Sequence, residues 1–174
     1  FVQHRTVLLL MLTATLYSLG ASAFVFLLPV FATQLLDAGP VELGWLWSSL
    51  GLGMLAASAW LAWINQGDLQ NRFRLISAAL AVGAVAVCTL GMLEAPVMAA
   101  ALIVVFGGST AVFTPIVWAM LQELTPEPLL GRVFTTLSTG AMASAMAGMA
   151  GFGWAADAIG PAASLVGIGA LLLV

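Results

Sequence analysis

Long blocks of hydrophobic residues follow one another along this chain, and short polar stretches with glycine and proline separate them. Five blocks are about 20 residues or longer, the length that an α-helix needs to cross the hydrocarbon core of a bilayer. None shows the alternation of apolar and polar residues that is typical of a membrane β-barrel strand. We therefore predict membrane-spanning helices over residues 6–36, 41–64, 73–93, 97–124 and 129–156, and a sixth that starts near residue 161 and is cut off at residue 174.

Arginines mark one side of the predicted membrane. If the loops alternate between the two sides, Arg5, Arg72, Arg74 and Arg132 all fall on one side, and only acidic residues fall on the other. Cytoplasmic loops carry an excess of basic residues, so this side is predicted to be cytoplasmic. We expect a multi-pass protein of a cell membrane, a bacterial inner membrane, with its N-terminus in the cytoplasm. The six tryptophans, Trp118 among them, fall near predicted helix ends and are interpreted as interfacial anchors.

The composition is that of a membrane protein, and the sequence lacks the motifs of the common classes of enzyme. Hydrophobic residues make up 63% of the chain and charged residues 6%, with a mean hydropathy of +1.15, whereas soluble domains carry about 25% charged residues. His4 is the only histidine and lies at the predicted cytoplasmic boundary, so neither a histidine-based metal site nor a Ser/His/Asp triad is available. No nucleotide-binding loop of the Gly-Lys-Ser type occurs, so ATP does not drive this chain directly. We expect no enzymatic activity, no cofactor, no metal and no nucleic-acid partner.

The two halves of the chain share an order of landmarks. Each half has a long helix with an internal proline, then an acidic turn with a second proline, then a helix rich in small residues. The landmarks are Pro29, Asp37, Pro40 and Gly44 in the first half and Pro115, Glu123, Pro126 and Gly131 about 86 residues later. Three spans per unit turn the second unit upside down, and inverted repeats of this kind are characteristic of secondary transporters. We predict an all-α membrane protein of two inverted three-helix repeats, at about 1–94 and 95–174; a chance recurrence of Pro and Gly is the alternative.

The most distinctive stretch joins the fourth and fifth predicted helices. Residues 121–133 read LQELTPEPLLGRV, in which a Pro and an acidic residue precede Gly-Arg-Val. Supporting features are Gly44, Gly51, Gly53 and the segment GFGWAADAIGP at residues 151–161. On these residues the chain resembles the C-terminal six-helix half of a major facilitator superfamily transporter. More narrowly, it resembles the drug and siderophore exporter branch, which includes the enterobactin exporter and macrolide efflux pumps.

The resemblance implies that residues 1–174 form one half of a major facilitator fold, and that the N-terminal half is absent from this sequence. It also implies export by alternating access, in which two six-helix halves rock about a substrate cavity near the bilayer midplane. The sequence starts at Phe1 rather than Met and stops at Val174 inside an apolar run of about 14 residues, too short for a full crossing. Both ends therefore favour a piece of a longer protein.

Candidate cavity residues follow from depth in the membrane and from helical spacing. The middle of the first and fourth helices lies near the bilayer centre, and in the superfamily the first helix of each repeat lines the cavity. The candidates are Tyr17, Phe24, Ser109, Phe113 and Thr114. Their aromatic and hydroxyl groups suit a bulky amphipathic or apolar solute. For each of them the alternative is helix packing, with Ser and Thr bonding back to their own helix carbonyls.

The fifth predicted helix contributes a junction and a packing face. Arg132, about one turn into this helix, is predicted to reach back to Glu123 or to the last carbonyls of the fourth helix and so to pin the cytoplasmic junction as a gating element. The alternative is a solvated arginine that serves only topology. Further along, two rows of small residues, at 140, 144 and 148 and at 143, 147 and 151, are predicted to let another helix approach closely.

We therefore expect a secondary active transporter that exports a bulky amphipathic or apolar small molecule. Its expected partners are that small-molecule substrate, the lipid bilayer, and the missing N-terminal half or a partner six-helix bundle. The alternative function is that of a non-transporting six-helix membrane subunit with a structural or assembly role in a complex. The sequence names neither the substrate nor a coupling ion.

Overall fold

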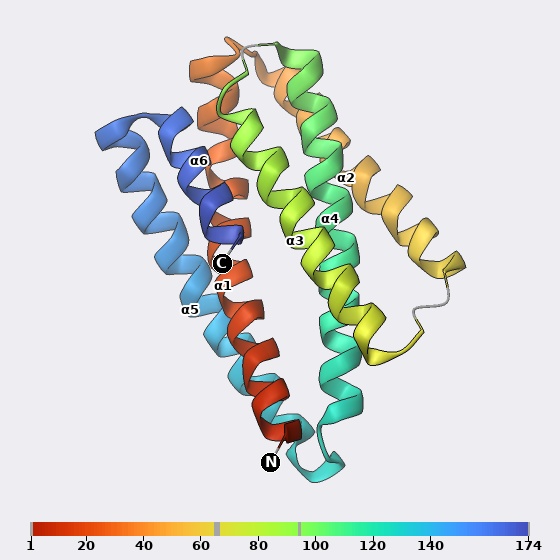
Figure 1. Ribbon diagram of the computed structural model, residues 1–174. Coiled ribbons are helices and arrows are strands. Elements are labelled where there is room, and N and C mark those ends of the chain that lie inside the picture. The colour runs from red at the N-terminus through yellow and green to blue at the C-terminus, as the bar shows by residue number, and fades with distance from the viewer. Residues whose placement is uncertain (1, 65–66, 94, 174) are drawn as a thin grey trace.

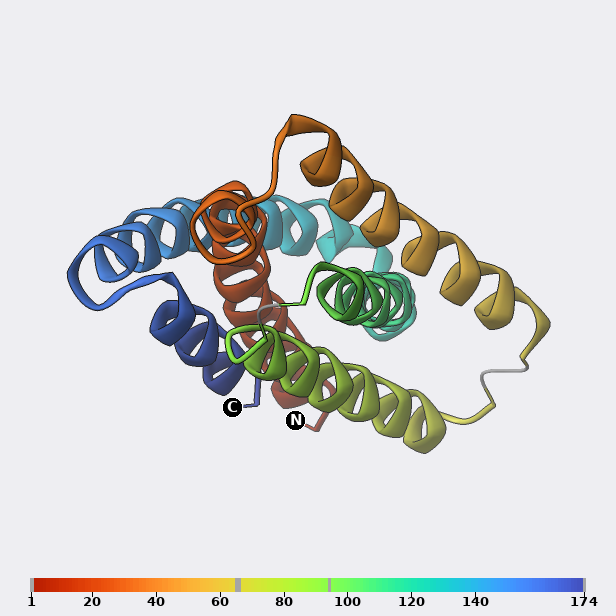
Figure 2. The same ribbon diagram turned by 90° about the horizontal axis from the view of Figure 1, so that it is seen from above.

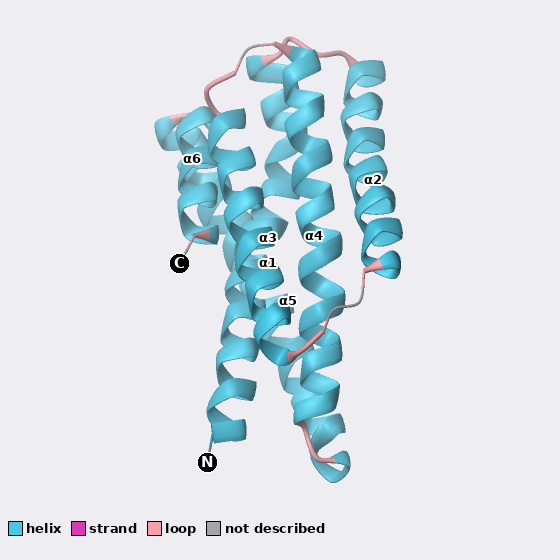
Figure 3. Ribbon diagram, turned by 45° about the vertical axis from the view of Figure 1, so that its right-hand side comes forward, coloured by secondary structure: helices cyan, strands magenta, loops and turns pink. Residues whose placement is uncertain are grey.

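The computed structural model describes residues 2–64, 67–93 and 95–173, and this part of the chain consists of α-helices joined by short turns (Figure 3). The side chain of His4 and the turn residue Glu94 lie outside the described residues. The helices are α1 (Val2–Leu35), α2 (Pro40–Trp63), α3 (Leu69–Leu90), α4 (Pro96–Leu124), α5 (Glu127–Ile159) and α6 (Pro161–Leu172). This confirms the six helices that the hydrophobic blocks predict. Some begin a turn earlier than predicted, because polar residues continue the helix beyond the apolar block.

Proline and glycine determine where several helices begin and end. Pro40, Pro96, Pro128 and Pro161 each occupy one of the first two positions of a helix, where the missing N–H group has no intrahelical partner to lose. Gly160 alone separates α5 from α6 and has a φ angle of +92°, which side chains with a Cβ atom rarely adopt. The chain therefore reverses within one residue and lays α6 back beside the bundle.

Successive helices run in opposite directions (Figure 1). The start of α1, the α4–α5 turn, the end of α2 and the start of α3 lie toward one end of the bundle, and the other three turns lie toward the opposite end. Arg5, Arg72, Arg74 and Arg132 all lie at the first of these ends, which we call the arginine end. The cytoplasmic placement of the arginine end stays a prediction.

The outer surface and the helix lengths suit a lipid environment. Among the described residues, four helices are long and apolar enough to cross a membrane, namely α2, α3, α4 and α1 from Arg5 onward. The 33-residue α5 is also long but carries Glu127, Arg132 and Asp157, and the 12-residue α6 extends for about 18 Å. Large apolar side chains such as Leu8 and Leu55 are exposed on the outside, where hydrocarbon rather than water would cover them.

Helices distant in sequence pack along one another. α1 contacts α5 and α6, α2 contacts α4, and α3 contacts α4 and α6. The view from above shows α2 at the edge of the bundle beside α4 (Figure 2). Small residues permit the closest approaches, because a Cβ atom at Gly53 of α2 would overlap the Val104 carbonyl, and one at Gly148 of α5 would overlap the Leu19 carbonyl. Gly148 belongs to one of the small-residue rows that predict such a contact.

Two neighbouring glycines of α2 provide a matched test of this packing. We expect Gly53→Ala to lower the free energy of unfolding by about 1–3 kcal/mol, because α4 must move away to admit the methyl group. The methyl group of Gly51→Ala has no atom within 4 Å, so we expect this change to leave the free energy of unfolding unchanged or to raise it slightly. Thermal unfolding of the two purified variants measures the difference. Equal melting temperatures would show that α2 and α4 are farther apart than the structure indicates.

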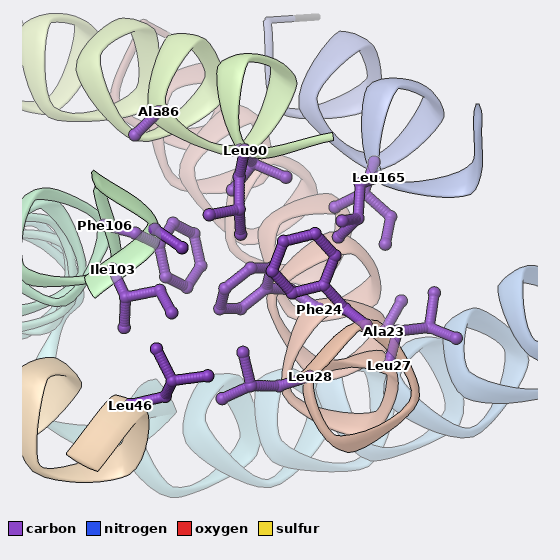
Figure 4. Close-up of a cluster of buried hydrophobic side chains, with 14 of the residues drawn as sticks. Ala23, Phe24, Leu27, Leu28, Leu46, Ala86, Leu90, Ile103, Phe106 and Leu165 are labelled. Atoms are coloured by element: carbon purple, nitrogen blue, oxygen red, sulfur yellow. The ribbon is translucent and has the colours of Figure 1, made fainter. Parts of the chain in front are cut away.

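Two apolar clusters fill the bundle. The first lies toward the end opposite the arginines, with residues from all six helices, and it includes Phe24, Leu28, Ile103, Phe106 and Leu165 (Figure 4). The second lies toward the arginine end, with residues from α1 to α5, and it includes Leu10, Ile76, Ile116, Met120 and Leu137. Tyr17 packs against both clusters. The boundary between the clusters therefore lies at the middle of α1 and α4.

Candidate functional site

A pocket of about 290 Å³ opens among α1, α4 and α5 at this boundary. We call it the central pocket. Its lining consists of Ala14, Tyr17 and Ser18 from α1, Phe113, Thr114, Val117 and Trp118 from α4, and Leu137, Ser138, Ala141 and Met142 from α5. Three helices from distant parts of the sequence thus meet around one hollow.

Tyr17 and Phe113 form a fixed aromatic wall of the central pocket. Their ring centroids lie 4.1 Å apart with the planes tilted by 31°, within the usual range for aromatic pairs. The Tyr17 hydroxyl donates a hydrogen bond of 2.7 Å to Oγ1 of Thr110, which in turn donates to the Phe106 carbonyl at 3.0 Å. The polar end of Tyr17 is thereby satisfied within the bundle, and its ring remains available to an apolar ligand.

Two hydroxyl groups on facing helices have no hydrogen-bond partner among the described residues. Thr114 on α4 and Ser138 on α5 both line the central pocket and are exposed. Ser18, on the third wall, instead donates to the carbonyl of Ala14 at 2.9 Å, as Ser in a membrane helix commonly does. The side chains of Thr114 and Ser138 are therefore the ones that can donate to and accept from a ligand.

Aromatic side chains bound the central pocket toward the arginine end. Trp118 of α4 lines the pocket, and its ring centroid lies 5.0 Å from that of Phe134 on α5. Sequence reasoning interprets Trp118 as an interfacial anchor, whereas the structure also gives it a place in the pocket wall. Together with Tyr17 and Phe113, it contributes three aromatic rings to an otherwise aliphatic and hydroxyl-bearing lining.

The five predicted cavity residues separate into two groups. Tyr17, Phe113 and Thr114 line the central pocket together. Phe24 is 0% exposed and packs on Phe106 in the first apolar cluster, with ring centroids 4.4 Å apart. Ser109 is buried, donates to the Phe106 carbonyl at 2.7 Å, and lies against Gly83 of α3. The structure therefore does not bring Phe24 and Ser109 to the pocket.

The α5 wall is the part of the pocket that sequence reasoning misses. The small residues of α5 are interpreted only as a packing face, yet Leu137, Ser138, Ala141 and Met142 line the pocket. The spacing of these four residues is the feature of the sequence that could have predicted this wall. Positions 137, 138, 141 and 142 repeat at three and four residues and so share one helical face.

An ion pair joins α3 to α4 at the arginine end. A guanidinium nitrogen (Nη1) of Arg72 donates to Oε2 of Glu123 at 2.7 Å, and the Arg72 side chain is 19% exposed. Arg132 is exposed, and among the described residues no bond joins it to the end of α4. The predicted partner of Glu123 was therefore wrong. The reason is tertiary: α3 packs directly on α4 and brings Arg72 to Glu123.

Comparison with known families decides the class of protein. All 174 residues match the profile of a family described as transmembrane secretion effector, within the major facilitator superfamily. The chain belongs to this family. No curated protein and no solved structure gives a significant match.

Membership in the transmembrane secretion effector family has three consequences. It confirms that the chain is a multi-pass membrane protein with a major facilitator type of helical fold. It confirms a transport protein of the secretion and efflux type rather than an enzyme. It also favours secondary transport over a purely structural membrane subunit, because the description of the family names secretion.

Proposed function

We propose that this transmembrane secretion effector exports a bulky amphipathic or apolar small molecule by alternating access, and that the central pocket forms part of the path. The observation that carries the proposal is the lining of this pocket. Rings from two helices and two hydroxyl groups without partners on facing helices surround a hollow of about 290 Å³. Sites for drug-sized ligands combine mainly apolar walls with a few polar groups in this way.

The depth of the central pocket supports a transport site. Tyr17 lies 12 positions after Arg5, and 12 residues of α-helix extend for about 18 Å. The hydrocarbon core is about 30 Å thick, so Tyr17 lies near its middle if Arg5 marks one surface. Substrate sites of secondary transporters lie near this midplane.

The arrangement of helices supports two inverted repeats. Exchanging α1, α2 and α3 with α4, α5 and α6 turns the α1–α5 contact into the α4–α2 contact, and the α1–α6 contact into the α4–α3 contact. All four contacts occur in the structure. On this basis we propose that residues 1–94 and 95–174 are the two repeats of the C-terminal half of a full transporter, with the arginine end in the cytoplasm.

The central pocket is closed toward the end opposite the arginines, as alternating access requires of one side at a time. Phe24 lies seven residues after Tyr17 on α1, and Phe106 lies seven residues before Phe113 on α4. The Phe24–Phe106 pair is therefore about 10 Å from the Tyr17–Phe113 pair, toward the end opposite the arginines. The side chains of Phe24 and Phe106 are buried and fill the space between α1 and α4 toward the end opposite the arginines. We propose that the pocket communicates with that end only after α1 and α4 shift relative to each other.

The proposed substrate class is tested by efflux from cells. The native polypeptide is expressed in a host with few other exporters, and the accumulation of a panel of bulky amphipathic, apolar, sugar and small anionic solutes is measured. We expect lower accumulation of at least one amphipathic or apolar solute, and no effect on the sugars and small anions. Export confined to sugars or small anions would contradict the proposed lining chemistry.

The two hydroxyl groups without partners give a graded prediction. We expect Thr114→Val and Ser138→Ala each to raise the substrate concentration for half-maximal transport by about twofold to tenfold for a solute with hydrogen-bonding groups. The maximal rate should change less, because the walls of the pocket remain. Thr135→Val on α5 serves as the control, since that hydroxyl bonds the Gly131 carbonyl outside the pocket. An equal effect of all three changes would argue against contact with the substrate.

A further inference from the structure

A second and larger cavity lies at the end of the bundle opposite the arginines. The end of α1, the start of α2 and the start of α4 border an open hollow of about 550 Å³. The lining residues are Leu36, Ala38, Val41, Glu42, Trp45, Leu46, Pro96, Val97 and Ala100. None of these residues lines the central pocket. The second cavity is therefore a separate place on the protein, which we call the outer cavity.

Two side chains distinguish the lining of the outer cavity. Among the described lining residues, Glu42 is the only charged one and Trp45 the only aromatic one, and the others are apolar. The two lie three positions apart in α2 and so share a face of the helix. The Trp45 side chain is 72% exposed, which leaves most of the indole open to a ligand. A carboxylate and an indole thus stand together at the edge of an apolar hollow.

The charge around Glu42 is unbalanced within the described part of the chain. All four arginines lie at the arginine end, and the described charged residues of the opposite end are Asp37, Glu42 and Asp157. Glu42 forms no ion pair with any described residue. A carboxylate beside an apolar hollow, with no cation nearby in the fold, provides an attractive position for a cation from outside.

Glu42 also has a structural role that must be separated from ligand binding. It occupies the first turn of α2, where a negative charge stabilises the helix end, and its carboxylate lies over Gly39, the residue that caps the helix. No side-chain hydrogen bond caps this end of α2, so the role of Glu42 there is electrostatic. The change Glu42→Gln keeps the size of the side chain and removes the charge, and thermal unfolding measures the resulting loss of stability at the helix end separately from binding.

We propose that the outer cavity binds an amphipathic organic cation, with its charged group between Glu42 and Trp45 and its apolar body against the remaining walls. A cation over an indole face is attracted by the ring, and Trp is the best of the aromatic residues for this contact. The apolar lining disfavours small hydrated cations, which keep their water. The same chemistry describes a free organic cation and the ammonium headgroup of a phospholipid. The proposal concerns binding and does not depend on which solute the central pocket exports.

Tetraphenylphosphonium and tetraphenylborate provide matched probes, because they have the same shape and opposite charge. The native polypeptide is placed in nanodiscs, and saturable binding of each probe is measured against empty nanodiscs. We expect Glu42→Gln to weaken tetraphenylphosphonium binding by about twofold to fivefold, and Trp45→Leu by about threefold to tenfold. Tetraphenylborate binding should not weaken in Glu42→Gln. Thermal unfolding of each variant verifies that the protein remains folded.

Matched controls lie on α5 at the same end of the bundle. Asp157→Asn and Trp154→Leu remove a charge and an indole that do not line the outer cavity, and we expect both to leave tetraphenylphosphonium binding unchanged. Equal binding by the wild type and all four variants would overturn the proposal. So would a loss of tetraphenylborate binding that matches the loss of tetraphenylphosphonium binding.

Lipid composition distinguishes the two sources of the cation. If phosphatidylethanolamine in the nanodiscs weakens tetraphenylphosphonium binding relative to phosphatidylglycerol alone, and Glu42→Gln abolishes this difference, the natural occupant is the lipid headgroup. If both lipids give the same affinity while Glu42 and Trp45 remain necessary, the occupant is a free cation. Both results support the proposed chemistry of the site.

Discussion

Tyr17→Ala is expected to reduce transport at least about tenfold, the largest effect that we predict for a single side chain of the central pocket. The change removes a ring that forms one wall of the pocket and packs on Phe113 at 4.1 Å. It also removes the hydroxyl that bonds Thr110 and ties α1 to α4. Initial rates of efflux in cells or vesicles, corrected for the amount of protein in the membrane, provide the measurement.

Tyr17→Phe separates the two roles of this residue. The ring remains, and only the hydrogen bond to Thr110 is lost, so we expect a reduction of about twofold to tenfold. Trp63→Ala removes an aromatic side chain that is 91% exposed at the end of α2, and transport should be unaffected. If Tyr17→Ala is no worse than Trp63→Ala at equal expression, the aromatic wall does not contact the substrate.

Reversing the charge of Arg72 is expected to lower the free energy of unfolding by about 2 kcal/mol, between the values for exposed and buried ion pairs. Arg72→Glu places two carboxylates where the structure has one ion pair of 2.7 Å, and α3 then separates from the end of α4. Glu123→Arg should have a similar effect, because two guanidinium groups then face each other. Thermal unfolding and the fraction of protein that reaches the membrane measure both changes.

The double exchange Arg72→Glu with Glu123→Arg restores opposite charges and should recover more than half of the lost stability. Arg74→Glu is the control for the loss of a basic residue at the arginine end, because Arg74 is exposed and no ion pair joins it to a described residue. A double variant that is as unstable as the sum of the single variants would show that this ion pair contributes nothing.

The hydrophobic blocks predict the helices well because, inside a bilayer, a long apolar segment satisfies its backbone hydrogen bonds by forming an α-helix. Proline and glycine then mark the turns, as at Pro40, Pro96 and Gly160. Local sequence therefore carries nearly all the information needed for the elements. It carries less about which helices touch, because several faces of each helix are equally apolar.

The candidate site shows what the local sequence does not predict, namely which side of each helix faces the pocket. Depth along the helix selects Tyr17, Phe113 and Thr114, which line the central pocket, but depth cannot tell one side of a helix from another. Phe24 has suitable depth, yet its side chain is buried against Phe106. Ser138 is missed for the opposite reason, because a row of small residues gives no sign that its helix also borders a hollow.

The ion pair at the arginine end illustrates the same limit. The sequence places Glu123 and four arginines on one side of the membrane, and nearness in sequence favours Arg132 as the partner. The structure chooses Arg72, which lies 51 residues away, because α3 packs on α4. Pairing of charges in a helical bundle follows the contacts between helices and cannot be derived from spacing alone.

The central claim is that the central pocket is part of a substrate path that opens to one side of the membrane at a time. Ser138→Cys, in a background without other reactive thiols, places a label site on the α5 wall. A membrane-impermeant maleimide is then applied from each side in turn, using right-side-out and inside-out vesicles, with and without a transported solute. We predict labelling from both sides and strong protection by the solute, whereas Val85→Cys, exposed on the outer face of α3, should remain unlabelled. Labelling of Ser138→Cys from neither side, or labelling that the transported solute does not change, would contradict the account.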